Sequence, residues 1–155
     1  MTGRAQVQRE RQRLDDTFKR ASRLKGDPEL SSDFARHLCV LVSGFLEQAA
    51  IELLLEHVRQ RSPQSIQRHI GQHLRRFSSA KANNLIGLFG SFDLAWETDL
   101  KLYLVDQHKD AVDAVIDLRH NIAHGRDTVV TMSRISEYYD RVKEVVDHIA
   151  NLCLP

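Results

Sequence analysis

A short segment around residue 120 carries the side chains of this 155-residue chain that are best suited to chemistry. Arg119 is followed five positions later by His124, and the polar pair His120 and Asn121 comes directly after the arginine. An arginine keeps its charge and grips phosphate with a fork of donors, whereas a histidine exchanges protons near neutral pH. Together these two residue types are the minimum equipment for cutting a phosphodiester without a metal ion.

The segment lies near the end of a predicted amphipathic helix, and its register decides how the side chains project. Positions 112, 116, 119 and 123 share the apolar side, and positions 113, 117, 120 and 124 share the polar side. At about 100° per residue, Arg119 and His124 point about 140° apart on an ideal helix. The two side chains can flank one cleft if the Arg119 side chain bends around the helix or if the last helical turn unwinds before Gly125. A second copy, packed antiparallel about a two-fold axis, would bring two such pairs to one groove.

Apolar periodicity predicts an all-α fold, a single-domain antiparallel bundle of about five to seven helices over residues 1–155. The first helix is expected over residues 4–25 and ends at Gly26-Asp27-Pro28, because proline cannot continue a helix. The second runs from Ser32 to about Arg61, with Ser31 or Ser32 as the candidate N-cap. Its apolar stripe is made of Phe34, Leu38, Leu41, Phe45, Ala49 and Leu53.

Ser62-Pro63 predicts the start of a third helix that ends near residue 76. Further helices are expected over residues 78–90, 93–104 and 109–125 and from 133 onward, with residues 128–131 as an extended connector. Asp93 is the candidate cap of the helix over 93–104, and Gly125 is expected to end its helix in the left-handed conformation.

Composition indicates an ordinary globular protein, with 42% hydrophobic and 28% charged residues. No uninterrupted apolar run approaches the roughly 20 residues that cross a bilayer, and the charged N-terminus lacks a signal-peptide core. Cys39 and Cys153 both lie in apolar helical stripes, which favours buried thiols over a disulfide or a metal pair. This predicts a reducing, cytoplasmic setting. Trp96 is interpreted as a core residue.

Charge is segregated along the chain, although the formal net charge is only +1. Between residues 57 and 92 there is no acidic residue, and from residue 93 onward acidic residues predominate. Segregated positive charge attracts a phosphate backbone, and the alternative is a solvated helix face whose counter-charges lie elsewhere in the fold. The candidate RNA-binding residues of this stretch are Arg68, Arg75, Arg76 and Lys81.

The segment also resembles a known family. The pattern R-x4-H, here Arg119 to His124 followed by Gly125, resembles the HEPN superfamily (higher eukaryotes and prokaryotes nucleotide-binding), many members of which are metal-independent endoribonucleases. The segment Leu-Arg-His-Asn-Ile-Ala-His-Gly is similar to the corresponding motif of the RiboL-PSP and MAE_28990-like branches. The resemblance implies an all-α homodimer with its active site at the dimer groove. It also implies a role in defence or stress response, as in toxins that a regulatory partner or antitoxin keeps silent.

The resemblance implies transesterification of RNA. His124 would remove the proton of a ribose 2′-OH or protonate the leaving 5′-oxygen, and Arg119 would hold the scissile phosphate. The products would be a 2′,3′-cyclic phosphate and a 5′-OH. His120 and Asn121 complete the candidate catalytic set, with Asn121 orienting either partner. Asp117 is expected to bond His120 or Asn121 one helical turn away.

Two further residues support or modify this hypothesis. Glu47, on the polar edge of the second helix, resembles a position where relatives place a supporting polar side chain, as does Ser43. Toxins of the family often carry a modifiable tyrosine two positions after the histidine, but here that position is Arg126, which argues against such regulation.

Several alternatives stay open on sequence alone. Arg119 is also consistent with a structural ion pair to Glu47, and a histidine before a terminal glycine is often only a favourable partner of the helix dipole. A non-catalytic RNA- or nucleotide-binding module, or a helical interaction protein, would fit the same helices. The pairs His69/His73 and His120/His124 have zinc-ligand spacing, but nothing completes a recognisable site. We therefore expect neither a metal nor a cofactor.

Overall fold

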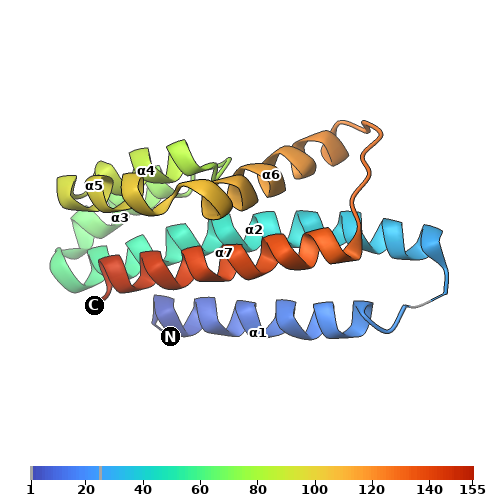
Figure 1. Ribbon diagram of the computed structural model, residues 1–155. Coiled ribbons are helices and arrows are strands. Elements are labelled where there is room, and N and C mark those ends of the chain that lie inside the picture. The colour runs from blue at the N-terminus through green and yellow to red at the C-terminus, as the bar shows by residue number, and fades with distance from the viewer. Residues whose placement is uncertain (1, 25) are drawn as a thin grey trace.

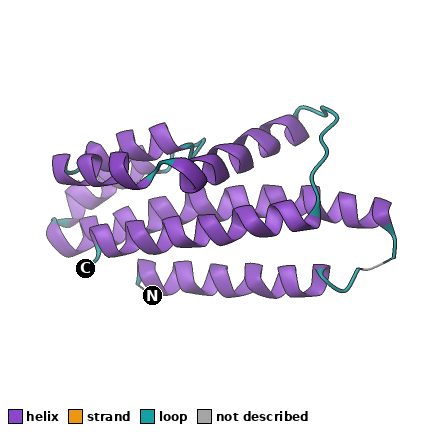
Figure 2. Cartoon of the chain, viewed as in Figure 1, coloured by secondary structure: helices purple, strands orange, loops and turns teal. Residues whose placement is uncertain are grey.

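The computed structural model describes residues 2–24 and 26–155, and over these residues the chain forms seven helices and no strand (Figures 1 and 2). The predicted all-α class is therefore confirmed. The helices are α1 (Gly3–Ala21), α2 (Pro28–Arg61), α3 (Gln64–Leu74), α4 (Ala82–Gly90), α5 (Leu94–Tyr103), α6 (Asp106–Ala123) and α7 (Met132–Cys153).

Helix α2 is the central element, because α1, α6 and α7 all pack against it (Figure 1). Its predicted apolar stripe is only part of what it buries. Leu38 and Leu53 of that stripe are fully buried, but so are Val42, Leu46 and Leu54 on other sides of the helix. A helix covered on several sides is apolar over most of its circumference, so no narrow stripe describes it. Trp96 is buried, as predicted.

By length and composition alone, α2 could cross a membrane. This was not expected from the sequence, because no uninterrupted apolar run in it approaches the length of a membrane span. However, 61% of its most apolar window is buried inside the bundle. Its apolar surface is thus already covered by neighbouring helices, as in the core helix of a globular domain.

Several helix ends differ from the sequence prediction. Helix α2 begins at Pro28 because the Asp27 carboxylate accepts hydrogen bonds from the backbone N–H groups of Glu29 and Leu30. Proline suits the first turn, where its missing N–H is not needed. The predicted cap Ser32 therefore lies inside the helix. The predicted end of the first helix at residue 25 lies outside the described residues, and α1 ends at Ala21.

The starts of the five later helices show a similar mixture. Asp93 caps α5 as predicted, by accepting from the N–H of Ala95. Helix α3 begins one residue after Pro63 with no side-chain cap, because Ser62 instead ends α2 and bonds backward to Val58. Helices α4, α6 and α7 begin at residues 82, 106 and 132, not at the predicted 78, 109 and 133. The connector over 128–131 is neither helix nor strand, and Thr131 at its end has the extended backbone that was predicted.

An aromatic stack ties α5 to α6 and α7 at one end of the bundle. The Tyr103 ring lies between His148, 3.6 Å away, and His108, 4.5 Å away, as measured between ring centroids. His148 Nε2 lies 2.5 Å from Asp99 Oδ1, and His108 Nε2 lies 2.7 Å from Glu144 Oε2. Burial and the nearby Glu144 carboxylate raise the pKa of Tyr103. These contacts fix the short helix α5 against the two long ones.

Candidate functional site

The R-x4-H segment forms the last turns of α6, which packs on α2 and α7 through buried residues such as Val112 and Val115. Gly125 ends the helix with φ +65°, as the sequence predicted. The N–H of Gly125 bonds the carbonyl of Ile122, and the N–H of Arg126 bonds the carbonyl of Asn121. This pair of bonds is the Schellman ending that a left-handed glycine permits. The turn therefore fixes where the helix stops and where His124 stands.

Arg119 points from α6 toward α2. Its Nη1 donates to Glu47 Oε1 at 2.8 Å and to Ser43 Oγ at 3.4 Å. Glu47 is only 13% exposed at its side chain and Ser43 is fully buried, whereas 37% of the Arg119 side chain remains exposed. The structural pairing anticipated for Glu47 is present, and it holds one edge of the guanidinium while leaving other donors of the group toward solvent.

Glu47 also fixes the segment that leads into α4. Its Oε1 accepts a hydrogen bond from the N–H of Ser79 at 3.0 Å, at a residue with φ +61°. Three residues later, Asp113 Oδ1 of α6 accepts from the N–H of Ala82 at 2.8 Å, so an acid from another helix caps α4. The sequence analysis missed Ser79 and Asp113, because neither contact is local and only the folded chain brings these positions together.

The two histidines lie at the exposed end of α6. His120 and His124 are both exposed, and their rings meet edge to face with centroids 4.3 Å apart and planes at 62°. Within the described residues, no hydrogen bond or ion pair joins Arg119 to His124. The angular separation expected from the helical register is consistent with this arrangement: the arginine is turned toward α2 and the histidines toward solvent.

Two of the expected supporting contacts are absent, and the structure replaces them with others. Asp117 bonds neither His120 nor Asn121. It pairs instead with Lys81, with Oδ1 2.6 Å from Nζ. Asn121 Oδ1 accepts from Arg126 Nη1 at 3.1 Å, so the amide supports the helix end. The sequence prediction for Asp117 was wrong because a cation from the segment before α4 reaches the carboxylate.

The four candidate RNA-binding residues occupy two different environments. The hydrogen bond and charge of Asp117 raise the pKa of the exposed Lys81 ammonium, and the ion pair offsets its charge. Arg68 and Arg75 lie on α3 and at its C-terminal cap, and Arg76 follows directly; all three are exposed. Within the described residues, no hydrogen bond or ion pair joins these three arginines to the R-x4-H segment. Of the four candidates, only Lys81 is tied to the helix that carries the motif, through Asp117.

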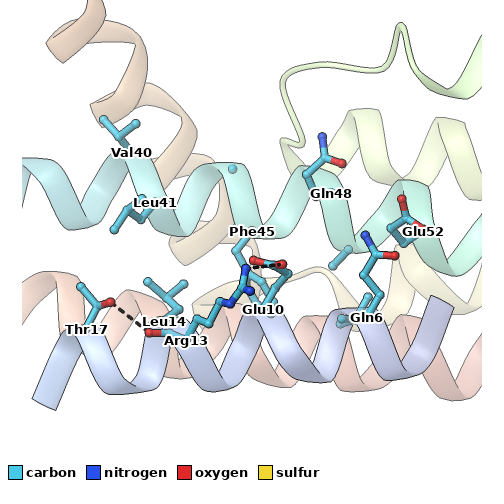
Figure 3. A pocket seen from close by; sticks show the side chains of 13 residues that line it. Gln6, Glu10, Arg13, Leu14, Thr17, Val40, Leu41, Phe45, Gln48 and Glu52 are labelled. Carbon is cyan, nitrogen blue, oxygen red and sulfur yellow. Dashed lines mark hydrogen bonds and ion pairs between the residues drawn. The ribbon is translucent and has the colours of Figure 1, made fainter. Parts of the chain in front are cut away.

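A hollow of about 450 Å³ lies between α1 and α2, away from the motif (Figure 3). Leu14, Leu41 and Phe45 form much of its floor, whereas Glu10 and Arg13 at the rim pair with each other at 3.3 Å. No residue of the R-x4-H segment lines it. Glu52 is the remaining charged residue of its lining. With one paired and one single charged group above an apolar floor, the hollow offers no converging set of catalytic side chains.

The cysteines and histidines give no metal centre among the described residues. Cys39 and Cys153 are free and buried, as predicted, and burial raises their thiol pKa values to about 12 and about 11. Across residues 2–24 and 26–155, no group of three or more His, Cys, Asp or Glu side chains is placed to hold a metal ion. The pair His69 and His73 accordingly has no third ligand there.

Comparison with known families decides what this arrangement belongs to. The family model described as RiboL-PSP-HEPN matches residues 5–154, nearly the whole chain. The chain belongs to this HEPN family. No curated protein and no solved structure matches it significantly. Many HEPN domains are ribonucleases, so membership indicates a nuclease or an RNA-interacting module.

Proposed function

We propose that this HEPN protein is a metal-independent endoribonuclease that cuts RNA by attack of a ribose 2′-OH on the adjacent phosphodiester. The observation that carries the proposal is how the two motif residues, Arg119 and His124, are held and exposed. Arg119 is anchored through one edge with 37% of its side chain exposed, and His124 stands exposed on a glycine-terminated helix end. A fixed cation and an accessible imidazole are the two groups that such a reaction requires.

Arg119 would bind the scissile phosphate and neutralise the charge that develops as the pentacoordinate state forms. The contacts to Glu47 and Ser43 hold the guanidinium before substrate arrives, so little ordering entropy is lost on binding. Glu47 is thus a positioning residue, since it would act through Arg119.

His124 would remove the 2′-OH proton as the general base. The bond from the 2′-oxygen to phosphorus forms while the bond to the 5′-oxygen breaks, and a second protonated imidazole returns a proton to that oxygen. His120, whose ring contacts His124, is one candidate acid, and the His124 of a second copy is another. The products are a 2′,3′-cyclic phosphate and a 5′-OH end. DNA would resist cleavage because it lacks the 2′-OH.

A homodimer is part of the proposal, because one chain leaves Arg119 and His124 on different sides of α6. Beside Ser43, α2 keeps an open surface that leads into the α1–α2 hollow: Val40 and Gly44 both line that hollow, Val40 is 40% exposed, and a Cβ built on Gly44 would meet nothing within 4 Å. Val40 lies only about 60° from Ser43 around the helix, from the roughly 100° turn per residue. A second copy packed there would bury this apolar strip and bring its own histidine toward Arg119.

The biological setting follows from the family resemblance. We propose a cytoplasmic enzyme of defence or stress response, with toxin-like activity that a regulatory partner or antitoxin restrains. Arg126 occupies the position at which related toxins carry a modifiable tyrosine, so restraint would come from binding and not from modification of that residue.

A second candidate function is a non-catalytic module that binds RNA or a nucleotide. The observation that favours it is the ion pair between Arg119 and Glu47. The Glu47 carboxylate already occupies a donor of the Arg119 guanidinium, and its negative charge weakens the attraction of Arg119 for a phosphate. In that case the protein would hold RNA in a salt-dependent way without cutting it.

Cleavage of an end-labelled RNA pool in EDTA separates the two functions. Purified wild type would be compared with Arg119→Ala, His124→Ala and the matched surface control His73→Ala on α3. We expect cyclic-phosphate products from the wild type and from His73→Ala, and a loss of at least about a hundredfold in the two motif variants. Helical circular dichroism and size-exclusion chromatography would establish that the variants fold and associate like the wild type.

Wild-type binding of RNA without cleavage would favour the non-catalytic module. Cleavage that survives both motif substitutions would refute the assignment of Arg119 and His124. Activity that EDTA abolishes and a divalent cation restores would refute the metal-independent mechanism.

A further inference from the structure

A second hollow, of about 600 Å³, lies between the C-terminal part of α2 and one face of α3. Its lining includes Arg59, Arg68 and Arg75 and contains no acidic and no aromatic residue. Gln64, Arg68, Gly71 and Arg75 recur at helical spacing, so a single face of α3 forms one wall. The hollow is therefore an elongated groove that follows α3, and we call it the α2–α3 groove.

The positive charge of this groove comes mainly from two arginines. Arg59 binds Glu56 through both Nε, at 3.0 Å, and Nη2, at 2.6 Å, which lowers the pKa of the Glu56 carboxyl and offsets the charge of Arg59. Arg68 and Arg75 form no ion pair with any residue that the structure describes. Two uncompensated guanidinium groups in a hollow without carboxylates are typical of an anion site.

Gly71 sets the position of one of these arginines. A Cβ built at Gly71 would lie 3.6 Å from Arg75 Nη1 and 3.5 Å from Leu55 Cδ2. The guanidinium of Arg75 thus lies beside the glycine, along the wall of the groove, while the residue stays exposed to solvent. Gln64 and Ser65 line the same groove at the start of α3, where no side chain caps the helix, so the helix dipole adds to the positive potential of the arginines.

The spacing of the arginines suits a chain of phosphates better than a single one. The backbones of Arg68 and Arg75 are seven residues apart, or about 10 Å along the helix axis, so the two side chains enter the groove from different turns of α3. At roughly 3.4 Å per nucleotide in a stacked strand, this backbone distance spans about three nucleotides, and the Arg75 guanidinium beside Gly71 lies within that span. The absence of aromatic side chains among the lining residues removes base stacking, which leaves contacts to the backbone.

We propose that the α2–α3 groove binds the phosphate backbone of single-stranded nucleic acid without regard to base or sugar. The inference deepens the proposed ribonuclease function by giving the substrate strand a binding site apart from the reacting groups. One side of α2 carries Gly44, Gln48, Leu55 and Arg59, because successive members of this set are four, seven and four residues apart. Glu47, beside Arg119, and Val58, in the groove, are eleven residues apart on α2. This is about 16 Å along the helix axis, which is the length of roughly five stacked nucleotides.

Fluorescence anisotropy with a labelled oligothymidylate of about twelve nucleotides tests the groove apart from catalysis, because DNA has no 2′-OH and is not cut. The full-length wild type would be compared with the double variant Arg68→Gln/Arg75→Gln. The matched control is Arg9→Gln/Arg20→Gln, which removes the same charge from exposed positions on α1.

We expect the groove variant to bind at least about tenfold more weakly, and the slope of log affinity against log salt to fall in magnitude by about 1.4, or 0.7 for each of two lost phosphate contacts. The α1 control should bind like the wild type. Equal weakening in the α1 control would show a net-charge effect and overturn the proposal, as would absence of binding by the wild type. Binding of tripolyphosphate or polyglutamate in preference to the oligonucleotide would also overturn it. Failure of RNA cleavage with DNA binding intact would refute the proposed enzyme alone.

Discussion

Replacing Glu47 by glutamine tests whether charge, and not packing alone, holds the motif arginine. Glu47 Oε1 accepts from Arg119 Nη1 at 2.8 Å and from the N–H of Ser79 at 3.0 Å. Glutamine keeps the size and the acceptor oxygen but removes the negative charge. A hydrogen bond to a charged group contributes about 1.5–3 kcal/mol to stability, against about 0.5–1.5 kcal/mol for a neutral bond. Two bonds therefore give an expected loss of about 2 kcal/mol before solvent screening.

Solvent reduces this figure, because 37% of the Arg119 side chain is exposed even though Glu47 is only 13% exposed. We expect Glu47→Gln to lower the free energy of unfolding by about 1 kcal/mol in urea denaturation followed by circular dichroism. The control is Glu137→Gln, whose pair with Arg134 spans 3.5 Å between side chains that are 66% and 60% exposed. Such a surface pair should contribute no more than about 0.3 kcal/mol. Equal losses in the two variants would refute the reasoning.

The same ion pair affects how the catalytic test must be read. Arg119→Ala leaves the Glu47 carboxylate largely buried without its cation, so the variant loses stability as well as chemistry. Adding Glu47→Gln to Arg119→Ala removes that unpaired charge and is expected to recover stability without recovering cleavage. If the double variant is no more stable than Arg119→Ala alone, the carboxylate is solvated in the absence of its partner, and the assigned burial of the pair is wrong.

Three other perturbations probe the elements that support the site. Gly125→Ala places a side chain at φ +65° and should cost about 1 kcal/mol and speed amide exchange in the last turn of α6; unchanged exchange would count against the assigned turn. Tyr139→Phe removes the bond from the phenol to Asp15 Oδ1 at 2.6 Å and should cost about 1 kcal/mol in thermal unfolding, whereas a neutral effect would mean that water replaces it. Burial raises the thiol pKa values of Cys39 and Cys153 to about 12 and about 11, so a thiol reagent at pH 8 should label them only after unfolding. Because the unfolded thiols lose protons that the folded thiols keep, stability should also fall as pH rises above about 9, and a flat profile would contradict the raised pKa values.

The sequence predicted those parts of the fold that depend on local chemistry. Gly125 at a left-handed helix end, Asp93 at a helix start and the apolar character of Cys39 all follow from residues close in the chain. The predicted start of the second helix failed for a related reason. Two caps were available, and Asp27 with its following proline displaced Ser32 from that role.

The supporting contacts of the site were harder to predict because they join distant segments. Glu47 was anticipated only as a loose match, and its bond to the N–H of Ser79 depends on how the chain returns from α3 to α4. Asp117 was assigned partners on its own helix, yet it pairs with Lys81, which precedes α4. No periodicity within α6 contains that information, since the competing cation belongs to another segment.

The opposed directions of Arg119 and His124 are best understood as a division of tasks along one helix end. An arginine that binds phosphate benefits from a rigid support, and only the side of α6 that faces α2 offers a carboxylate and a hydroxyl. A histidine that exchanges protons needs access to substrate and water, which the exposed side beside Gly125 provides. Five residues of helix satisfy both needs but leave the two groups apart within one chain. Joining them therefore requires a second surface, and a second copy of the same helix end is the surface that supplies the missing group in the matching orientation.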